Sequence, residues 1–236
     1  MRVEPHAVGS IMHIIKRGTR GMEIVRDDQD RFNFVRSLYI LNDYYQDNNW
    51  RTYISGKPLF YRPKSWPQRR PLVSVLAWTL LDNHFHLLLK ETEEGGIAKF
   101  MQRLGGSMTL TFNEKYDGSG SIFQGGYRGR IIETDEYLQY VHTYIVAKNT
   151  FDMFPGGFKK ALAQFERAWE FAQEYRFTSL FTSITGTPSP VLDMNEVQSL
   201  GFIKKDFKKY AKSMLLAHAQ SKNVAVDIAE LILEEW

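Results

Sequence analysis

The chain has 236 residues, of which 43% are hydrophobic and 24% charged, with a formal net charge of +3, as is ordinary for a soluble globular protein. It contains no cysteine, which excludes disulfides, thiolate metal sites and cysteine nucleophiles and leaves His, Asp, Glu, Asn and Gln as possible metal ligands. No apolar run approaches the roughly 20 residues that span a bilayer. Residues 1–10 do not resemble a secretory signal, so we expect a cytoplasmic protein.

The first third of the chain predicts a strand, a helix and a long irregular connection. Residues 10–16 form a short apolar run that is typical of a strand. Asp27 or Asp28 can cap the helix that follows. The apolar face of this helix includes Phe32, Val35, Leu38 and Leu41. Residues 46–71 contain several prolines, which favour irregular structure.

Within this connection, residues 51–72 carry basic and aromatic side chains but no acidic one. The basic residues are Arg51, Lys57, Arg62, Lys64, Arg69 and Arg70, and the aromatic ones are Tyr53, Phe60, Tyr61 and Trp66. Nucleic acids attract cations through the phosphates and stack their bases on aromatic rings. The segment is therefore either a nucleic-acid contact or a solvated loop.

Two apolar runs, 73–81 and 84–90, predict an antiparallel hairpin, and the second contains a histidine pair. His84 and His86 are two residues apart, so on a strand both imidazoles point to the same face and can bind one divalent cation. Phe85 then faces the core. The alternative is that both histidines only form hydrogen bonds at a strand edge.

The rest of the chain completes a sheet and adds helices. The pattern predicts a helix over 96–116, a glycine-rich loop over 118–126, a short strand over 128–133, a helix over 134–149, and further helices over 159–175 and 195–236, the last broken near residues 219–223. The order strand, helix, strand, strand, helix, strand fits an α+β fold with a ferredoxin-like split βαβ antiparallel sheet. We expect one domain over residues 1–155 and a helical C-terminal extension over residues 156–236.

Three tyrosines share one face of the predicted helix over 134–149. Tyr137, Tyr140 and Tyr144 stand at positions i, i+3 and i+7, whereas His142 falls on the opposite side. The tyrosines either pack on the sheet as an aromatic stripe or supply a nucleophile. His13, on the first predicted strand, lies near the histidine pair or is merely buried.

Five segments of the chain together resemble the IS200-like transposase family, the Y1 transposases of the HUH superfamily, and within it the REP-associated tyrosine transposases. The resemblance extends over about residues 8–150 and implies an HUH endonuclease fold, a split βαβ sheet with helices on one face. The matching segments are HIIKRGTRG (13–21), DDQDRF (27–32), VLAWTLLDNHFHLLLK (75–90), MQRLGGSMTLTFNEKYDGSGSIFQGGYRGRII (101–132) and YLQYVHTYIVAKN (137–149).

The resemblance implies a site with a metal-binding histidine pair, matched here by His84 and His86, and a nucleophilic tyrosine, matched by Tyr144. The family's tyrosine opens a Tyr-Ile-x-x-Asn motif whose asparagine completes the metal site. Here Lys148 occupies that place and Asn149 follows one residue later. In an α-helix, position i+5 does not stack on position i. Either the helix end tightens or slips so that Asn149 reaches the metal, or Lys148 contacts the scissile phosphate instead.

The activity that the resemblance implies is cleavage and rejoining of single-stranded DNA that bears a hairpin of the REP kind. The cofactor is Mg²⁺ or Mn²⁺, and the intermediate is a 5′-phosphotyrosine. Arg17 and Arg128 lie in the matching segments, and we expect them, with Lys148, to contact DNA. Relatives include both monomers and homodimers, so both states stay open.

Two other functions are compatible with these residues. The first is a DNA-binding protein that has lost cleavage, which is supported by Lys148 standing where the family has asparagine. The second is a metal-dependent phosphoesterase that would use water in place of tyrosine. The C-terminal extension is either a DNA-binding helical module or a packed cap. Its basic residues are Lys204, Lys205, Lys208, Lys209 and Lys212, and its apolar ones include Phe202, Ile203, Phe207, Tyr210 and Leu215.

Overall fold

A computed structural model of the chain describes residues 6–221 and contains one four-stranded sheet. Its strands are β1 (Ile11–Arg17), β2 (Val73–Leu80), β3 (His84–Glu91) and β4 (Arg128–Ile131). They are arranged in the order β2-β3-β1-β4 and all neighbours pair antiparallel. This is the order of a ferredoxin-like split βαβ sheet, so the predicted fold class is confirmed.

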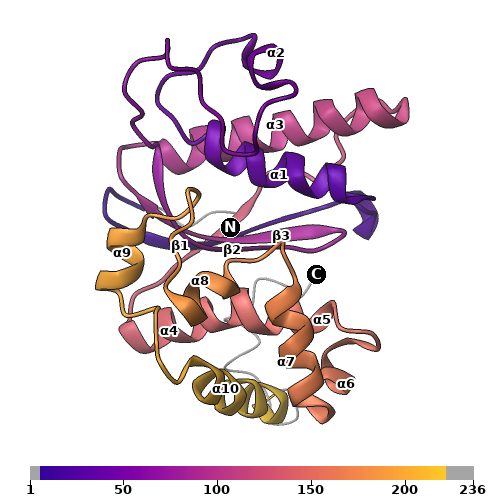
Figure 1. Cartoon of the computed structure of the whole chain (residues 1–236), viewed down its shortest axis with the longest axis vertical. Coiled ribbons are helices and arrows are strands. Elements are labelled where there is room, and N and C mark those ends of the chain that lie inside the picture. The colour runs from indigo at the N-terminus through magenta and orange to yellow at the C-terminus, as the bar shows by residue number, and fades with distance from the viewer. Residues whose placement is uncertain (1–5, 222–236) are drawn as a thin grey trace.

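The two helices that connect these strands lie side by side on one face of the sheet (Figure 1). They are α1 (Asp28–Ile40) and α3 (Gly96–Tyr116), and a short turn, η1 (Thr19–Gly21), precedes α1. The side chain of Asp27 accepts a hydrogen bond from the backbone N–H of Asp30, as predicted for an N-cap. Phe34 of α1 packs against Phe85 of β3 with ring centroids 5.1 Å apart, so Phe85 faces this helical layer.

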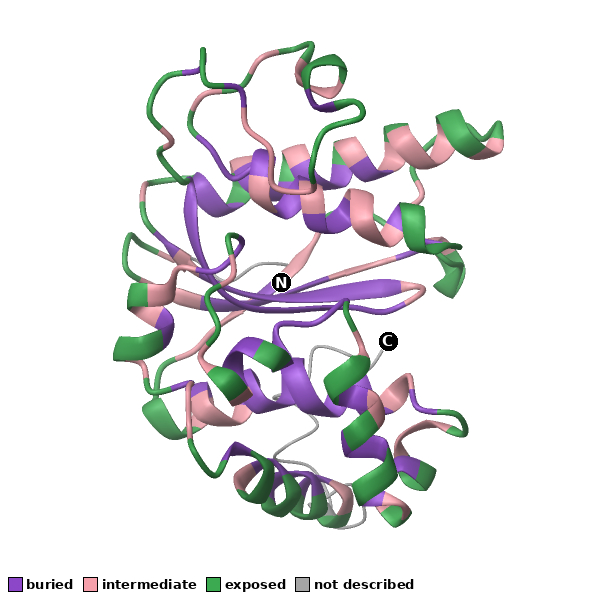
Figure 2. Cartoon of the chain, in the orientation of Figure 1, coloured by how far each residue is buried: buried purple, intermediate pink, exposed green. Residues whose placement is uncertain are grey.

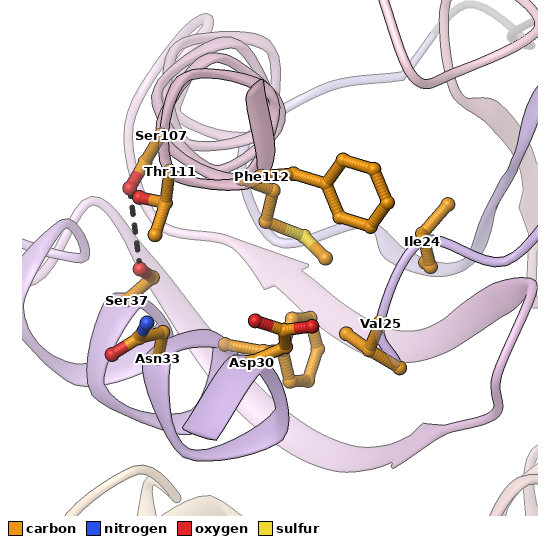
Figure 3. Close-up of a pocket in the computed structure, with 10 residues that line it drawn as sticks. Ile24, Val25, Asp30, Asn33, Ser37, Ser107, Thr111 and Phe112 are labelled. Carbon is orange, nitrogen blue, oxygen red and sulfur yellow. Dashed lines mark hydrogen bonds between the residues drawn. The ribbon is translucent and has the colours of Figure 1, made fainter. Parts of the chain in front are cut away.

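A small cavity lies between α1 and α3 (Figure 3). Its volume of about 20 Å³ is enough for roughly one water molecule. Ser37 and Ser107 form a hydrogen bond across it at 3.4 Å, and the carboxylate of Asp30 borders it. The cavity lies on the α1/α3 side of the sheet, away from the face that carries the histidine pair.

The connection from α1 to β2 contains one short helix, α2 (Trp50–Ile54), where irregular structure was predicted. Several basic side chains of this connection bind other residues of the protein. Arg62 pairs with the buried carboxylate of Asp43 at 2.8 Å, and Arg51 pairs with Glu114 of α3. Arg69 donates to the backbone carbonyl of Tyr39 in α1 and to that of Asn42 just after this helix. These bonds give the basic residues a structural role in holding the connection on α1 and α3.

Helices after β4 cover the second face of the sheet (Figure 1), so helices lie on both faces and not on one alone. They are α4 (Asp135–Thr143), the turn η2 (Tyr144–Lys148), α5 (Asn149–Asp152), α6 (Gly157–Ala163), α7 (Phe165–Glu174), α8 (Leu180–Thr185), α9 (Met194–Ser199) and α10 (Phe207–Ser221). The larger of two buried apolar clusters runs through both layers and the sheet between them (Figure 2). A domain boundary after residue 155 stays a prediction.

Three boundaries in the C-terminal part differ from the sequence prediction. The helix predicted over 159–175 is interrupted at Gln164, and α8 was not predicted. The break in the last helical stretch falls at 200–206 because Gly201 takes a positive φ of 67°, which ends α9. The predicted break at 219–223 and the helix beyond it fall partly outside the described residues. No helix between residues 6 and 221 has the length and apolar character needed to cross a membrane.

Candidate functional site

The histidine pair lies on the face of the sheet opposite α1 and α3. Because side chains alternate along a strand, His84 and His86 point away from the face to which Phe85 contributes. Their ring centroids are 5.0 Å apart, and both side chains are buried. The prediction that the two imidazoles share a face is therefore confirmed, and β3 is a central strand, so the pair does not lie at a sheet edge.

Each histidine of the pair has its Nδ1 atom directed at a protein group. Nδ1 of His86 lies 2.8 Å from Nε2 of His13 on the neighbouring strand, and Nδ1 of His84 lies 2.5 Å from the side-chain oxygen of Asn83. His13 is only 2% exposed. His13 was expected either to lie near the histidine pair or to be merely buried. It is buried and also lies next to the pair.

Three arginines extend this face toward β1 and β4. Directly opposed residues of antiparallel strands share a face. Arg17 lies opposite His84, Arg130 lies opposite His13, and Arg128 is two residues before Arg130 on the same strand. All three therefore belong to the histidine face. Arg128 and Arg17 were predicted from the sequence, whereas Arg130 was missed, although its spacing of two from Arg128 would have indicated it.

Tyr144 lies directly over the histidines. Its ring centroid is 6.1 Å from that of His86 and 6.3 Å from that of His13, and the residue is 2% exposed. Tyr140 lies one turn earlier, and its ring centroid is 6.2 Å from that of Tyr144. Tyr137 lies earlier still, with its ring centroid 6.4 Å from that of Tyr140. The predicted stripe of three tyrosines is confirmed, and its last member, Tyr144, is the one whose ring contacts His86 and His13.

The helix that carries Tyr144 changes its winding at that residue. From Tyr144 to Lys148 it forms a π-turn, in which the backbone N–H of Asn149 donates to the carbonyl of Tyr144, five residues earlier. An i+5 bond brings residue i+5 toward the face of residue i, as the i+4 bond does in an α-helix. Asn149 is thereby brought toward the side of the helix that carries Tyr144. Asn149 stands one residue later than the asparagine of the family motif. The π-turn is a slip of the helix end of the kind that would offset this displacement.

Neighbouring threonine hydroxyls bind two carbonyls of the π-turn. The hydroxyl of Thr79 on β2 donates to the carbonyl of Ile145, and that of Thr150 donates to the carbonyl of Val146 at 2.7 Å. Thr79 lies opposite His86 in the β2–β3 pairing. The turn is therefore tied to the same part of the sheet that carries the histidine pair.

Asn149 is fully buried, with 0% of its surface exposed. Among residues 6–221, neither its amide oxygen nor its amide nitrogen has a hydrogen-bond partner. Burying an amide without a partner costs about 1–3 kcal/mol. A bound ion or a water molecule can satisfy such a group, and an amide oxygen is a suitable ligand for a hard divalent cation.

Lys148 occupies a different environment from the one that a surface DNA contact would require. Its side chain is buried, its Nζ atom lies 4.7 Å from the centroid of the Tyr144 ring, and it pairs with Asp152 at 2.9 Å. The ammonium group is thus next to Tyr144. A contact between Lys148 and a phosphate stays a prediction, and it requires the site to open.

Helix α10 packs over the tyrosine stripe. His218 of α10 is buried, its Nδ1 atom is 2.8 Å from the hydroxyl of Tyr140, and its ring is 5.6 Å from that of Tyr144. Phe207 and Leu215 of the same helix join the core, so α10 packs on the rest of the protein, and a DNA contact by its lysines stays a prediction. A role for His218 could not be predicted from the sequence, because nothing in the local pattern around it indicates a partner on the helix over 134–149.

His142 lies on the opposite side of α4 from the tyrosines, as predicted. It stacks on Phe202 with centroids 4.0 Å apart and lies 3.1 Å from the hydroxyl of Ser183. Burial, aided by the positive charge of Lys204, lowers the pKa of His142 to about 3 from 6.5. His142 is therefore a neutral core residue that does not contact Tyr144.

This burial predicts acid sensitivity of the fold. Below pH 6.5 the unfolded chain protonates His142 while the folded chain keeps it neutral, so the free energy of unfolding falls as the pH falls toward 3. One such group contributes up to about 1.4 kcal/mol per pH unit. Urea unfolding at pH 7 and pH 5 should show a smaller loss for His142→Gln than for the wild type. Equal losses would contradict this account.

The donor set of the site fits a divalent metal ion. If Nδ1 of His84 carries its proton toward the Asn83 oxygen, the ring binds a cation through Nε2, and the same tautomer suits His86. Within residues 6–221 no three His, Asp or Glu side chains gather to hold a metal by themselves. The buried amide of Asn149 is thus the best remaining candidate for a third ligand beside the two imidazoles.

The sheet order, the face that carries the histidines and the tyrosine helix above it define the fold class expected of an HUH endonuclease. Residues 68–148 match the model of a family described as "Transposase IS200 like". The expected resemblance to that family is thereby confirmed over these residues. The matched segment contains both histidines and Tyr144, and it ends immediately before Asn149.

No curated protein matches the chain. Among solved structures, the chain is similar to one titled "Structure of the REP associates tyrosine transposase bound to a REP hairpin", with a TM-score of 0.44 and 10% sequence identity, over 80% of this chain and 90% of the other.

Proposed function

We propose that the protein is a divalent-metal-dependent endonuclease and strand transferase for single-stranded DNA, acting as a transposase of the IS200-like kind. The observation that carries the proposal is the edge-to-face packing of the Tyr144 ring on His86 and His13, together with the π-turn that brings Asn149 toward the same side. His84, His86 and Asn149 would hold Mg²⁺ or Mn²⁺. When bound, the ion would neutralise charge that develops on the scissile phosphate.

Tyr144 is the proposed nucleophile. Its Oη atom attacks the phosphorus and loses its proton, the bond from phosphorus to the 3′ oxygen breaks, and that oxygen leaves as a 3′-hydroxyl after taking up a proton. The product is a 5′-phosphotyrosine, which conserves the energy of the phosphodiester bond. Attack by another 3′-hydroxyl then rejoins the strands and restores the tyrosine.

The arginines on the histidine face would bind the DNA backbone beside the scissile phosphate. We propose a hairpin-bearing single strand of the REP kind as substrate, on the strength of the family resemblance. Arg17, Arg128 and Arg130 line the sheet from β1 to β4 next to the histidines, where phosphates would have to lie to reach Tyr144.

Replacing Arg128 or Arg130 with alanine should weaken binding of single-stranded DNA about equally across sequences. Each lost phosphate contact should reduce the slope of log affinity against log salt by about 0.7. Fluorescence anisotropy over a salt series measures both quantities. Arg167→Ala, which removes an exposed arginine of α7, is the matched control. If the three variants lose affinity alike, Arg128 and Arg130 have no special place in DNA binding.

Tyr140 is the competing nucleophile, because it combines greater exposure with a histidine partner. It is half-buried, whereas Tyr144 is 2% exposed, and its hydroxyl is 2.8 Å from Nδ1 of His218. A tyrosine hydroxyl within this distance of a neutral imidazole can pass its proton to that ring. DNA must displace part of the covering layer before it reaches Tyr144, whereas Tyr140 lies closer to the surface.

The proposed function is tested with purified protein and hairpin-bearing single-stranded oligonucleotides labelled at the 5′ or 3′ end. In Mn²⁺ or Mg²⁺, a denaturing gel should show protein joined to the 3′ fragment through its 5′ phosphate, and EDTA should abolish the product. Cleavage without any adduct would favour a water-using phosphoesterase. Hairpin binding without cleavage in either metal would favour a DNA-binding protein that has lost the reaction.

A further inference from the structure

We propose that His13 is a positioning residue for the metal site, which holds the imidazole of His86 in the tautomer and orientation that bind a cation. The inference rests on the proposed function, because it requires that His84 and His86 bind a metal. It assigns a role to a third histidine, on a different strand from the pair.

The contact between the two rings is held by regular structure on both sides. His13 and His86 belong to adjacent antiparallel strands, and the β1–β3 register places them diagonally, since Ile15 is the residue directly opposite His86. The bond between Nε2 of His13 and Nδ1 of His86 is 2.8 Å long, and the rings are nearly parallel, with an interplanar angle of 23°. Both rings are buried, so neither can turn without disturbing the core.

The chemistry of the bond determines which nitrogen of His86 faces a cation. One hydrogen lies between the two nitrogens, and neutral imidazole carries a hydrogen on only one of its nitrogens. If His86 binds a cation through Nε2, its Nδ1 keeps the hydrogen and donates it to Nε2 of His13. A second partner that fixes the tautomer and plane of a ligating histidine is a regular feature of metal sites.

His84 has the equivalent arrangement, which supports the same assignment. Its Nδ1 faces the amide oxygen of Asn83, an acceptor, so Nδ1 carries the hydrogen there as well. Both members of the pair would then present Nε2 to one cation. His13 is not itself a third ligand in this arrangement, because its Nε2 atom accepts the hydrogen from His86.

The test compares His13→Leu with His13→Gln in the full chain without DNA. Leucine fills the buried position but removes the acceptor, whereas the Oε1 atom of glutamine can take the place of Nε2. Mn²⁺ affinity is measured by electron paramagnetic resonance, and the His86 tautomer by nitrogen–proton correlation spectra of the rings. Circular dichroism and the thermal midpoint check that each variant is folded.

The inference predicts that His86 of the wild type carries its hydrogen on Nδ1. His13→Leu should weaken Mn²⁺ binding about 10- to 100-fold, and glutamine should restore most of it. A folded His13→Leu protein that binds Mn²⁺ as the wild type does would overturn the inference, and so would a wild-type His86 protonated on Nε2. If the wild type binds no Mn²⁺, or if His84→Ala binds it as tightly as the wild type does, the proposed metal site fails as well, and that outcome is distinct.

Discussion

Replacing Tyr144 with phenylalanine should abolish the covalent protein–DNA adduct and slow strand cleavage by about 10³-fold or more, as removal of an enzyme nucleophile does. The substitution removes one hydroxyl and leaves the ring, which packs against His86, His13 and Lys148. The fold and DNA binding should therefore stay close to those of the wild type. Single-turnover cleavage of a labelled hairpin oligonucleotide measures the effect.

Tyr140→Phe and Tyr137→Phe are the matched controls, because they remove a hydroxyl from the same stripe of rings. Both should retain the adduct. The result that contradicts the assignment is an adduct that persists in Tyr144→Phe and disappears in Tyr140→Phe. In that case His218→Ala should also lose the adduct, since the hydroxyl of Tyr140 would have lost the imidazole 2.8 Å away that takes its proton.

Replacing Asn149 with alanine should weaken binding of Mn²⁺ at least about 10-fold, the lower end of the losses seen when groups around a metal are removed. Asn149 is buried, and its amide has no hydrogen-bond partner among residues 6–221, so its loss should not destabilise the fold by breaking a hydrogen bond. Isothermal titration calorimetry of the DNA-free protein measures the affinity. Asn149→Ala that binds Mn²⁺ as tightly as the wild type would remove this residue from the metal site.

Deleting Lys148 is a complementary test of the π-turn. The deletion restores the spacing Tyr-Ile-x-x-Asn, and an ordinary α-helical turn would then place the asparagine on the face of the tyrosine. Metal affinity should stay close to that of the wild type, although the ion pair with Asp152 is lost. A large loss would show that the π-turn does more than offset the additional residue.

Much of the scaffold could be predicted from the sequence because it follows from local periodicity. The alternation around Phe85 placed His84 and His86 on one face, and the spacing of Tyr137, Tyr140 and Tyr144 placed their rings on one side of a helix. The order of strands and helices then led to the split βαβ sheet. These features depend on residues close to one another in the chain.

The features that the sequence left open or missed depend on contacts between distant segments. The π-turn at Tyr144 is stabilised by Thr79 of β2, and no pattern within residues 134–149 reports that partner. The bond from His13 to His86 depends on the register of two strands. The covering of the tyrosines by His218 depends on how α10 folds back after the break at Gly201.

The most direct test of the central claim is to locate the attachment point of DNA on the protein. Protein is incubated with hairpin-bearing single-stranded DNA and Mn²⁺, digested with protease and nuclease, and the nucleotide-bearing peptide is sequenced by mass spectrometry. We predict one modified residue, Tyr144, linked to a 5′ phosphate. Modification of a different residue, or cleaved DNA without any modified peptide, would contradict the claim that Tyr144 is the nucleophile of a metal-dependent strand transferase.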